Sequence, residues 1–332
     1  MLTFLARRLF VMIPTLFFIS VLVFVIIQLP PGDFLSTYLN ELQAQGEAVD
    51  PAKIAFLKQQ YGLDQPIWLQ YIDWAWGLLH GDLGFSFEYN LPVTEVVGDR
   101  LWLSMVLNLS TVVFIYIVSF PIGIYSATRQ YSWGDYGFTL LGFLGLAMPN
   151  FLFALILLYY ANVVFGTSIG GLMDPEFINQ GWSFAKAMSV AEHLWAPVLV
   201  IGTSGTASMI RRLRANLLDE LGKQYVVTAH AKGLSPTRVL FKYPLRMALN
   251  PFIADIGNIL PQVVSGSVLV SVVMSLPTTG PMLLTALQSQ DMYLAGSFLM
   301  FLALLTVIGM FVSDLLLAWL DPRIRLQGGV SQ

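Results

Sequence analysis

The sequence predicts an all-α membrane protein with six transmembrane helices and a partly helical external insert after the first helix. Hydrophobic residues make up 56% of the 332 residues and charged residues only 11%, whereas a soluble domain carries about 25% charged residues. Six apolar runs approach or exceed the length needed, at about 1.5 Å per residue, to cross a hydrocarbon core roughly 30 Å thick. The absence of cysteine excludes disulfides and thiolate chemistry.

The first transmembrane helix is expected within residues 1–30. Arg7 and Arg8 precede an apolar run over residues 9–29, and Pro30-Pro31-Gly32-Asp33 follows it. A cleaved signal peptide is the alternative, but no small-x-small cleavage site follows the run, which is longer than the usual apolar region of such a peptide. We therefore expect an uncleaved helix.

Residues 31–100 are expected to form an external (periplasmic) insert. Asp50-Pro51 can cap and begin a helix that Gly62 closes. Pro66 begins a second helix with dense aromatic residues, namely Trp68, Tyr71, Trp74 and Trp76. Aromatic residues beside a bilayer favour an interfacial helix over a ligand-stacking platform.

Residues 101–320 are expected to form the transmembrane core, and residues 321–332 a cytoplasmic tail. The five further spans are predicted at 101–128, 138–165, 195–210, 248–273 and 295–320, with a polar, glycine-rich loop at 166–194. Prolines interrupt these spans at positions 121, 149, 197, 251 and 261, and the fourth span is rich in small residues. Small residues allow close helix packing, and proline bends need neighbours or water, so we expect a packed bundle with a cavity.

The distribution of charge predicts that both termini are cytoplasmic. With the N-terminus inside, 13 of the 17 basic residues fall on cytoplasmic segments, while 13 of the 20 acidic residues fall on the insert and the 166–194 loop. This asymmetry is typical of membrane proteins. The net charge of −3 and the lack of a basic patch outside the loops give no indication of a nucleic-acid partner.

Residues 211–246 form the longest segment expected in the cytoplasm, and they carry eight Lys and Arg residues. Gly233 stands where a helix ending near Lys232 needs a left-handed residue, and Ser235-Pro236 can cap and begin the next helix. We therefore predict two short helices joined by a tight turn, the second stopping at Pro244. A solvated, positively charged loop without a partner is the alternative.

The first of these two helices carries a patterned face. Tyr225, Thr228, Ala229 and Lys232 are spaced i, i+3, i+4 and i+7, so they are expected to share one side of the helix. Such a small and aromatic face can enter a groove on a partner, while the flanking basic residues set the orientation.

The same stretch resembles the EAA coupling motif of membrane subunits of bacterial ABC importers, in the form of the peptide/oligopeptide permease branch. The resemblance rests on Thr228-Ala229, Gly233 and Pro244, with Thr228 in place of the usual glutamate and His230 where arginine is common. Further patches resembling this branch cover nearly the whole chain: Arg7-Arg8, Pro31-Gly32-Asp33, Tyr61 to Pro66, Gly81 to Gly84 with Ser86, Pro92-Val93, and Leu320 to Arg325. The turn from Ser275 to Pro281 departs from the pattern.

This resemblance implies the fold of a type I importer permease in the bacterial inner membrane, moving di- or oligopeptides. It implies coupling to an ATPase through Tyr225, Thr228, Ala229, His230, Lys232, Gly233, Ser235 and Pro236. The implied partners are a second homologous permease, two ATP-binding cassette subunits, an external substrate-binding protein and the lipid bilayer. The chain itself would bind no cofactor, because ATP and magnesium belong to the ATPases. The departing turn leaves oligosaccharides open as the substrate.

The residue chemistry is compatible with this interpretation. The sequence has no phosphate-binding Gly-x-x-x-x-Gly-Lys-Ser/Thr loop, no nucleophile elbow, and only three scattered histidines, so neither ATP hydrolysis nor a metal site is expected. A secondary transporter and a membrane-embedded enzyme are the alternatives, but we find no internal repeat and no catalytic constellation.

Polar residues within the spans are the candidates for a translocation path. Asn258 and Gln262 share a helix face at i, i+4, and Asp255 and Asn150 are further candidates. For Asp255, and likewise for Asp314, the alternative is a carboxylate at a helix end that pairs with a nearby arginine.

Overall fold

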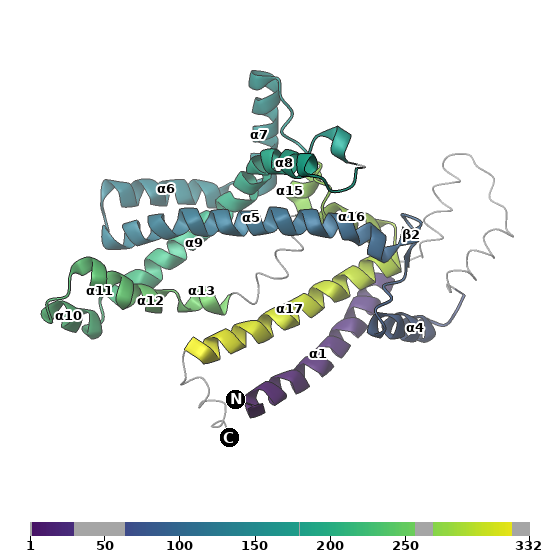
Figure 1. The fold of residues 1–332 in the computed structure, drawn as a ribbon, viewed down its shortest axis with the longest axis horizontal. Helices are drawn as coiled ribbons and strands as arrows, with labels where there is room; N and C mark the ends of the chain where they lie inside the picture. The colour runs from purple at the N-terminus through teal and green to yellow at the C-terminus, as the bar shows by residue number, and fades with distance from the viewer. Residues whose placement is uncertain (1, 30–63, 179, 256–267, 321–332) are drawn as a thin grey trace.

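A computed structural model describes residues 2–29, 64–178, 180–255 and 268–320. Helices dominate this part of the chain (Figure 1): α1 (Leu2–Gln28), α4 (Ile67–Leu79), α5 (Val93–Thr128), α6 (Trp133–Ala147), α7 (Asn150–Phe165), α8 (Phe184–His193), α9 (Trp195–Leu221), α10 (Gln224–Ala231), α11 (Pro236–Lys242), α12 (Pro244–Ala248), α13 (Asn250–Ala254), α15 (Val268–Val273), α16 (Thr279–Gln288) and α17 (Met292–Leu320). A 3-10 turn covers Pro175–Phe177, and the antiparallel strands β1 (Phe85–Ser86) and β2 (Leu91–Pro92) pair Phe85 with Pro92. The predicted all-α class is confirmed.

Three helices of the described chain are long and apolar enough to cross a membrane, or up to five if each of two bent pairs is one span. The three are α1 over Phe10–Gln28, α5, and α17 over Met292–Leu315. The predicted span 138–165 is not one straight helix, because α6 and α7 meet at 96°. Pro149 lies at the break, where its ring and missing N–H oppose helix continuation. The predicted span 248–273 includes residues 256–267, which lie outside the described part, so the count of six stays a prediction.

Several element boundaries differ from the prediction. The second span begins earlier, because α5 starts at Val93 directly after Pro92. The 166–194 loop contains helix α8, and α16 follows the Ser275 turn; neither helix was predicted. The second helix of the insert is confirmed as α4, on which Trp74 is 3% exposed and Trp76 is 65% exposed. The first predicted helix of the insert lies outside the described residues.

Long helices packed side by side form the core. Helix α5 packs along α9, and α1 packs along α17 (Figure 1). Close approach of α5 and α9 depends on glycine: a methyl group at Gly202 would lie 2.6 Å from the ring of Phe114, and one at Gly205 would lie 2.5 Å from Ile115 Cδ1. The predicted role of small residues in the fourth span therefore has a direct structural basis.

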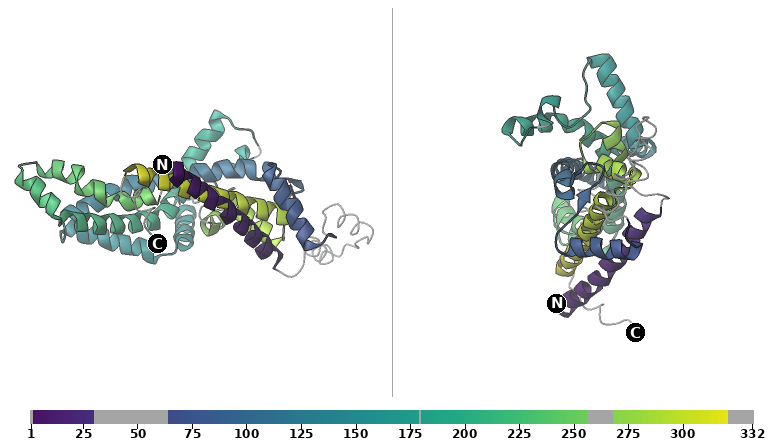
Figure 2. Two further views of the ribbon diagram at one scale, coloured as in Figure 1. Left: turned by 90° about the horizontal axis from the view of Figure 1, so that it is seen from below. Right: turned by 90° about the vertical axis from the view of Figure 1, so that its right-hand side faces the viewer.

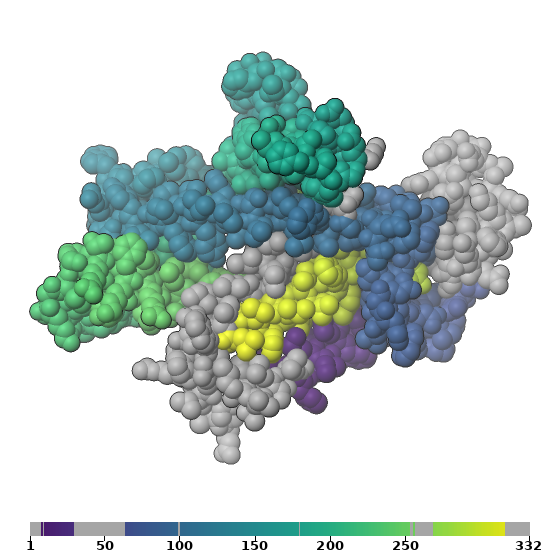
Figure 3. Space-filling model, viewed as in Figure 1, coloured from purple at the N-terminus to yellow at the C-terminus, as the bar shows by residue number. Residues whose placement is uncertain are grey.

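The described molecule is elongated, with short helices at its edges. Helices α10, α11 and α12 extend beyond one end of the bundle, while α4 and the β-hairpin lie at the other end (Figures 1 and 3). Helices α7 and α8 project sideways from the bundle, as the right-hand view of Figure 2 shows. The short helices within residues 211–246, which are predicted to bind a partner, thus protrude from one end of the bundle.

Candidate functional site

The candidate site is the elbow, by which we mean residues 224–242: α10, the turn at Gly233, and α11. Gly233 adopts the left-handed conformation with φ of 76°, and its N–H donates to His230 O at 2.9 Å. Ser235 caps α11 through its backbone, since Val239 N donates to Ser235 O at 2.9 Å, and Pro236 is the first helical residue. The predicted helix, turn and second helix are confirmed.

A small apolar core holds the two helices of the elbow together. Val226, Ala229 and Val239 are buried, and Leu234 and Tyr243 pack against them. Ala229 is only 5% exposed, so the four patterned residues do not share one exposed face as the spacing suggested. Ala229 instead supports the elbow from inside, because a small residue there lets α10 approach α11.

The outer surface of the elbow combines basic and apolar groups. The exposed residues include Tyr225, Thr228 and His230 on α10, Lys232 directly after it, and Arg238 and Lys242 on α11. Val227 and Phe241 are 56% and 59% exposed. The hydroxyl of Thr228 is used within the helix, where it donates to Gln224 O at 2.9 Å, and a threonine side chain has no charge to offer a partner. Apolar anchors ringed by cations suit a groove with an acidic rim.

The junction between α9 and α10 is fixed by Glu220. Its carboxylate accepts hydrogen bonds from Lys223 Nζ at 2.5 Å and from the Tyr225 hydroxyl. Burial, together with this hydrogen bond to Glu220, raises the pKa of Tyr225 well above its ordinary value. Through this hydrogen bond the Tyr225 hydroxyl acts as a donor that orients α10 on the end of α9.

The elbow is mounted on α9 through α12. Leu213 and Leu217 of α9 are fully buried against Leu245 and Ala248 of α12 and Phe252 of α13. Helix α9 runs from this cluster to the opposite side of the bundle (Figure 1). A force on the elbow would therefore act on a helix that is continuous through the core.

Three pairs between an arginine and an aspartate join separate elements of the described chain. Asp255 pairs with Arg212, and Asp314 pairs with Arg8 at 3.0 Å, so the alternative of arginine-paired carboxylates is confirmed for both. A pair that the sequence analysis missed joins Arg214 to Asp135, which is 2% exposed. The Ser132 hydroxyl, three residues before Asp135, accepts a hydrogen bond from the Asp135 N–H. This capping pattern in the sequence marks the start of the helix on which Asp135 lies.

Of the candidate path residues, Asn150 and Asp255 lie in the described part of the chain, and they belong to different elements. Asn258 and Gln262 lie outside the described residues. Asn150 is the first residue of α7, half-buried beside the bend at Pro149, whereas Asp255 follows α13 and is engaged by Arg212. The assignment of a translocation path thus stays a prediction.

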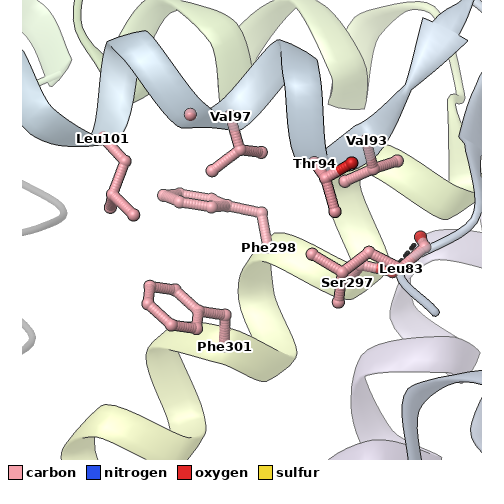
Figure 4. A pocket seen from close by; sticks show the side chains of 9 residues that line it. Leu83, Val93, Thr94, Val97, Leu101, Ser297, Phe298 and Phe301 are labelled. Atoms are coloured by element: carbon pink, nitrogen blue, oxygen red, sulfur yellow. Dashed lines mark hydrogen bonds between the residues drawn. The ribbon is translucent and has the colours of Figure 1, made fainter. Parts of the chain in front are cut away.

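A hollow of about 170 Å³ lies between α5 and α17, at the end of the bundle opposite the elbow. Figure 4 shows Val97, Phe298 and Phe301 facing it. Ser297 also lines it, but its hydroxyl donates to Leu83 O at 2.8 Å. Such an apolar lining offers few of the directed polar contacts that a peptide or sugar needs. Among the described residues no cluster of three His, Asp or Glu side chains could hold a metal ion.

Comparison with known families gives two matches that together span most of the chain. The model described as "Binding-protein-dependent transport system inner membrane component" matches residues 119–326. The model of the N-terminal part of such membrane components matches residues 1–110. The elbow, α9 and α17 all lie within the larger match.

Curated relatives are similar over their full length. The oligopeptide transport system permease protein AppB of Bacillus subtilis is 34% identical over 98% of this chain and 100% of the relative. The dipeptide transport system permease protein DppB of Escherichia coli K12 is 30% identical over 98% and 99%, respectively. The di/tripeptide transport system permease protein DppB of Pseudomonas aeruginosa is 32% identical over 98% and 100%.

Proposed function

The chain belongs to the family of binding-protein-dependent transport system inner membrane components, and on that premise we propose that it carries di- and oligopeptides across the bacterial inner membrane as one permease of an ATP-driven importer. It is a membrane permease subunit and not itself an enzyme. This family assignment argues against the secondary-transporter and membrane-enzyme alternatives. The full-length similarity to relatives named for oligopeptides, dipeptides and di/tripeptides supports a peptide as the substrate.

The observation that carries the coupling mechanism is the rigid elbow at the end of α9. Its turn is fixed by Gly233, its interior is packed by Val226, Ala229 and Val239, and its surface is basic and apolar. We assign ATPase coupling to Tyr225, Thr228, His230, Lys232, Gly233, Ser235 and Pro236, with Ala229 as an internal support. Closure of two ATP-binding cassette subunits, which hold the ATP and magnesium, would press on this surface.

Motion of the elbow would then pass to α9. Because α12 packs on α9 and Arg214 holds the first turn of α6, the three elements would move together. Tilting α9 against α5 would switch the cavity between inward and outward access. A second homologous permease completes the cavity in this proposal, and an external binding protein delivers the peptide.

We also propose that the elbow and both termini face the cytoplasm. The excess of basic residues on this side, including all eight between 211 and 246, supports that orientation. The insert and α8 would then face the periplasm.

Reconstitution tests this function. The tagged chain is purified from its native membrane in mild detergent, and every co-purifying protein is identified and reconstituted with it in liposomes. We expect two ATPases, or two copies of one, with a second permease and a binding protein, and ATP-dependent uptake of a labelled tripeptide. Uptake of a labelled trisaccharide instead would overturn the substrate class. Uptake by the chain alone without ATP would overturn the importer.

A further inference from the structure

Helix α8 exposes large apolar side chains to its surroundings while it buries two polar ones. Its outward side carries Phe184, which is 88% exposed, and Met188, which is 53% exposed, together with three exposed alanines at 185, 187 and 191. Its inward side carries Val190, which is 3% exposed, and beside it two polar residues, Lys186 and Ser189, which are 3% and 4% exposed. A surface helix in water exposes its polar residues and buries its large apolar ones.

The buried polar groups of α8 are satisfied, which fixes its rotation. Lys186 Nζ donates to Gln180 O at 2.6 Å and lies 5.3 Å from the centre of the Trp182 ring. Ser189 Oγ donates to Asp174 Oδ2 at 2.6 Å. Turning the apolar side inward would break these contacts and leave a lysine without its carbonyl partner. The exposure of Phe184 and Met188 is therefore built into the fold.

The position of α8 is set by α9. Leu194 alone separates the two helices, which meet at 45°. Trp182 and Trp195 lie just before and just after α8, and they are 44% and 55% exposed. Tryptophan is enriched at the boundary between hydrocarbon and water. Helix α8 thus leaves α9 beside residues that are typical of this boundary, and the elbow lies at the other end of α9 (Figure 1).

We propose that α8 is an interfacial helix that inserts Phe184 and Met188 among the acyl chains of the leaflet opposite the elbow. The occupant of this face is the phospholipid bilayer, because α8 and α9 together form one of the two bent helix pairs that are apolar enough to cross a membrane. The face is also bordered by tryptophans and carries Glu192 as its one ionisable side chain within α8. An interfacial helix of this kind holds its end of α9 at a fixed depth. The other end of α9, which carries the elbow, can then tilt about this fixed end.

The lack of cysteine in the chain allows a direct test. Single-cysteine variants Phe184→Cys and Met188→Cys of the full chain are spin-labelled in liposomes of phosphatidylethanolamine and phosphatidylglycerol. Glu176→Cys is the matched control, because Glu176 is exposed in the same loop but lies outside α8. We expect the labels at 184 and 188 to collide more with oxygen than with a water-soluble nickel complex, and the label at 176 to show the opposite order.

Both other outcomes overturn the proposal. Labels at 184 and 188 that collide with the nickel complex as often as the label at 176 would place the face in water. Labels shielded from both reagents would place it against protein. Repeating the measurement on the complete importer with its binding protein separates these cases further: lipid contact predicts unchanged oxygen access, whereas a protein occupant predicts its loss. Neither readout requires transport activity, so the result is independent of the proposed substrate.

Discussion

Arg214 binds the Asp135 carboxylate through two hydrogen bonds, from Nε to Oδ1 at 2.9 Å and from Nη2 to Oδ2 at 2.8 Å. The N–H of Tyr131 adds a third at 2.9 Å. Planar, two-point binding of this kind fixes the relative orientation of the groups. Helix α6 is thereby held to the stretch of α9 that carries the elbow.

Removing the Asp135 carboxylate should destabilise the protein strongly. The change Asp135→Ala leaves the Arg214 guanidinium partly buried without its counter-charge, which costs about 3–5 kcal/mol in comparable buried pairs. We expect a clear fall in the free energy of unfolding, measured by denaturant titration in detergent. The double variant Asp135→Leu with Arg214→Met should recover much of the loss, because it leaves no uncompensated charge.

The matched control is Asp255→Ala. The side chains of Asp255 and its partner Arg212 are 42% and 44% exposed, and exposed pairs contribute only about 0–1 kcal/mol. Equal losses at the two sites would contradict the view that burial makes the Asp135 pair important.

The conformation of Gly233 predicts its response to substitution. No atom lies within 4 Å of a methyl group placed there, so Gly233→Ala would be disfavoured by its backbone alone, by about 1–2 kcal/mol. We expect the strained turn to change the angle between α10 and α11 and to lower peptide uptake per ATP hydrolysed in the reconstituted importer. Gly233→Asn should retain more coupling, since asparagine tolerates a positive φ.

Gly222→Ala controls for a methyl group added near the elbow. Gly222 has φ of −78°, and the nearest atom to the added methyl group is Asp219 O at 3.9 Å. The Gly222→Ala variant should keep the unaltered ratio of peptide uptake to ATP hydrolysed. If both Gly233→Ala and the bulkier Gly233→Trp kept the unaltered ratio of peptide uptake to ATP hydrolysis, the elbow would not be part of the coupling mechanism.

The elbow was predictable from the sequence because its signals are local. Gly233 and Ser235-Pro236 define a turn through backbone preferences that need no tertiary contact. The inward position of Ala229 was not predictable, because spacing places residues on one side of a helix without saying which side meets α11. Helix α8 was missed for a related reason. From the sequence alone, Lys186 and Ser189 are expected to face solvent, whereas in the structure they bind Gln180 and Asp174. The 96° bend depends on how α7 packs, which Pro149 permits but does not specify.

Gly84 should tolerate substitution less well than Gly81. Both have φ of 81°, so alanine carries a similar backbone strain at either position. A methyl group at Gly84 would in addition lie 2.3 Å from Tyr293 Cδ1, whereas nothing lies within 4 Å of one at Gly81. We expect Gly84→Ala to lower the free energy of unfolding by about 1–3 kcal/mol more than Gly81→Ala. The excess should disappear when both are compared in a Tyr293→Ala background, and equal losses in the unaltered background would refute the contact.

Asp291 predicts a pH dependence of stability at the end of the bundle opposite the elbow. It is fully buried, accepts a hydrogen bond from Ser86 Oγ at 2.6 Å, and accepts two more from Glu88 N and Leu294 N at 3.1 Å. Burial raises the pKa of this carboxyl above 3.8, although the hydrogen bonds oppose the shift. The acid is therefore easier to protonate in the folded chain than in the unfolded chain.

The sign of the effect follows from linkage. A raised pKa in the folded state gives a contribution that is fully present below the unfolded pKa and is lost as the pH rises through the folded pKa. The difference in unfolding free energy between the unaltered chain and Asp291→Asn should thus shift in favour of the unaltered chain as the pH falls from neutral into the mildly acidic range. Thermal unfolding of both chains across this range measures it. Ser86→Ala removes a hydrogen bond that favours the carboxylate, so it should raise the pKa further and move the transition to higher pH. A difference between the chains that does not change with pH would show that Asp291 is ionised throughout and that its hydrogen bonds outweigh its burial.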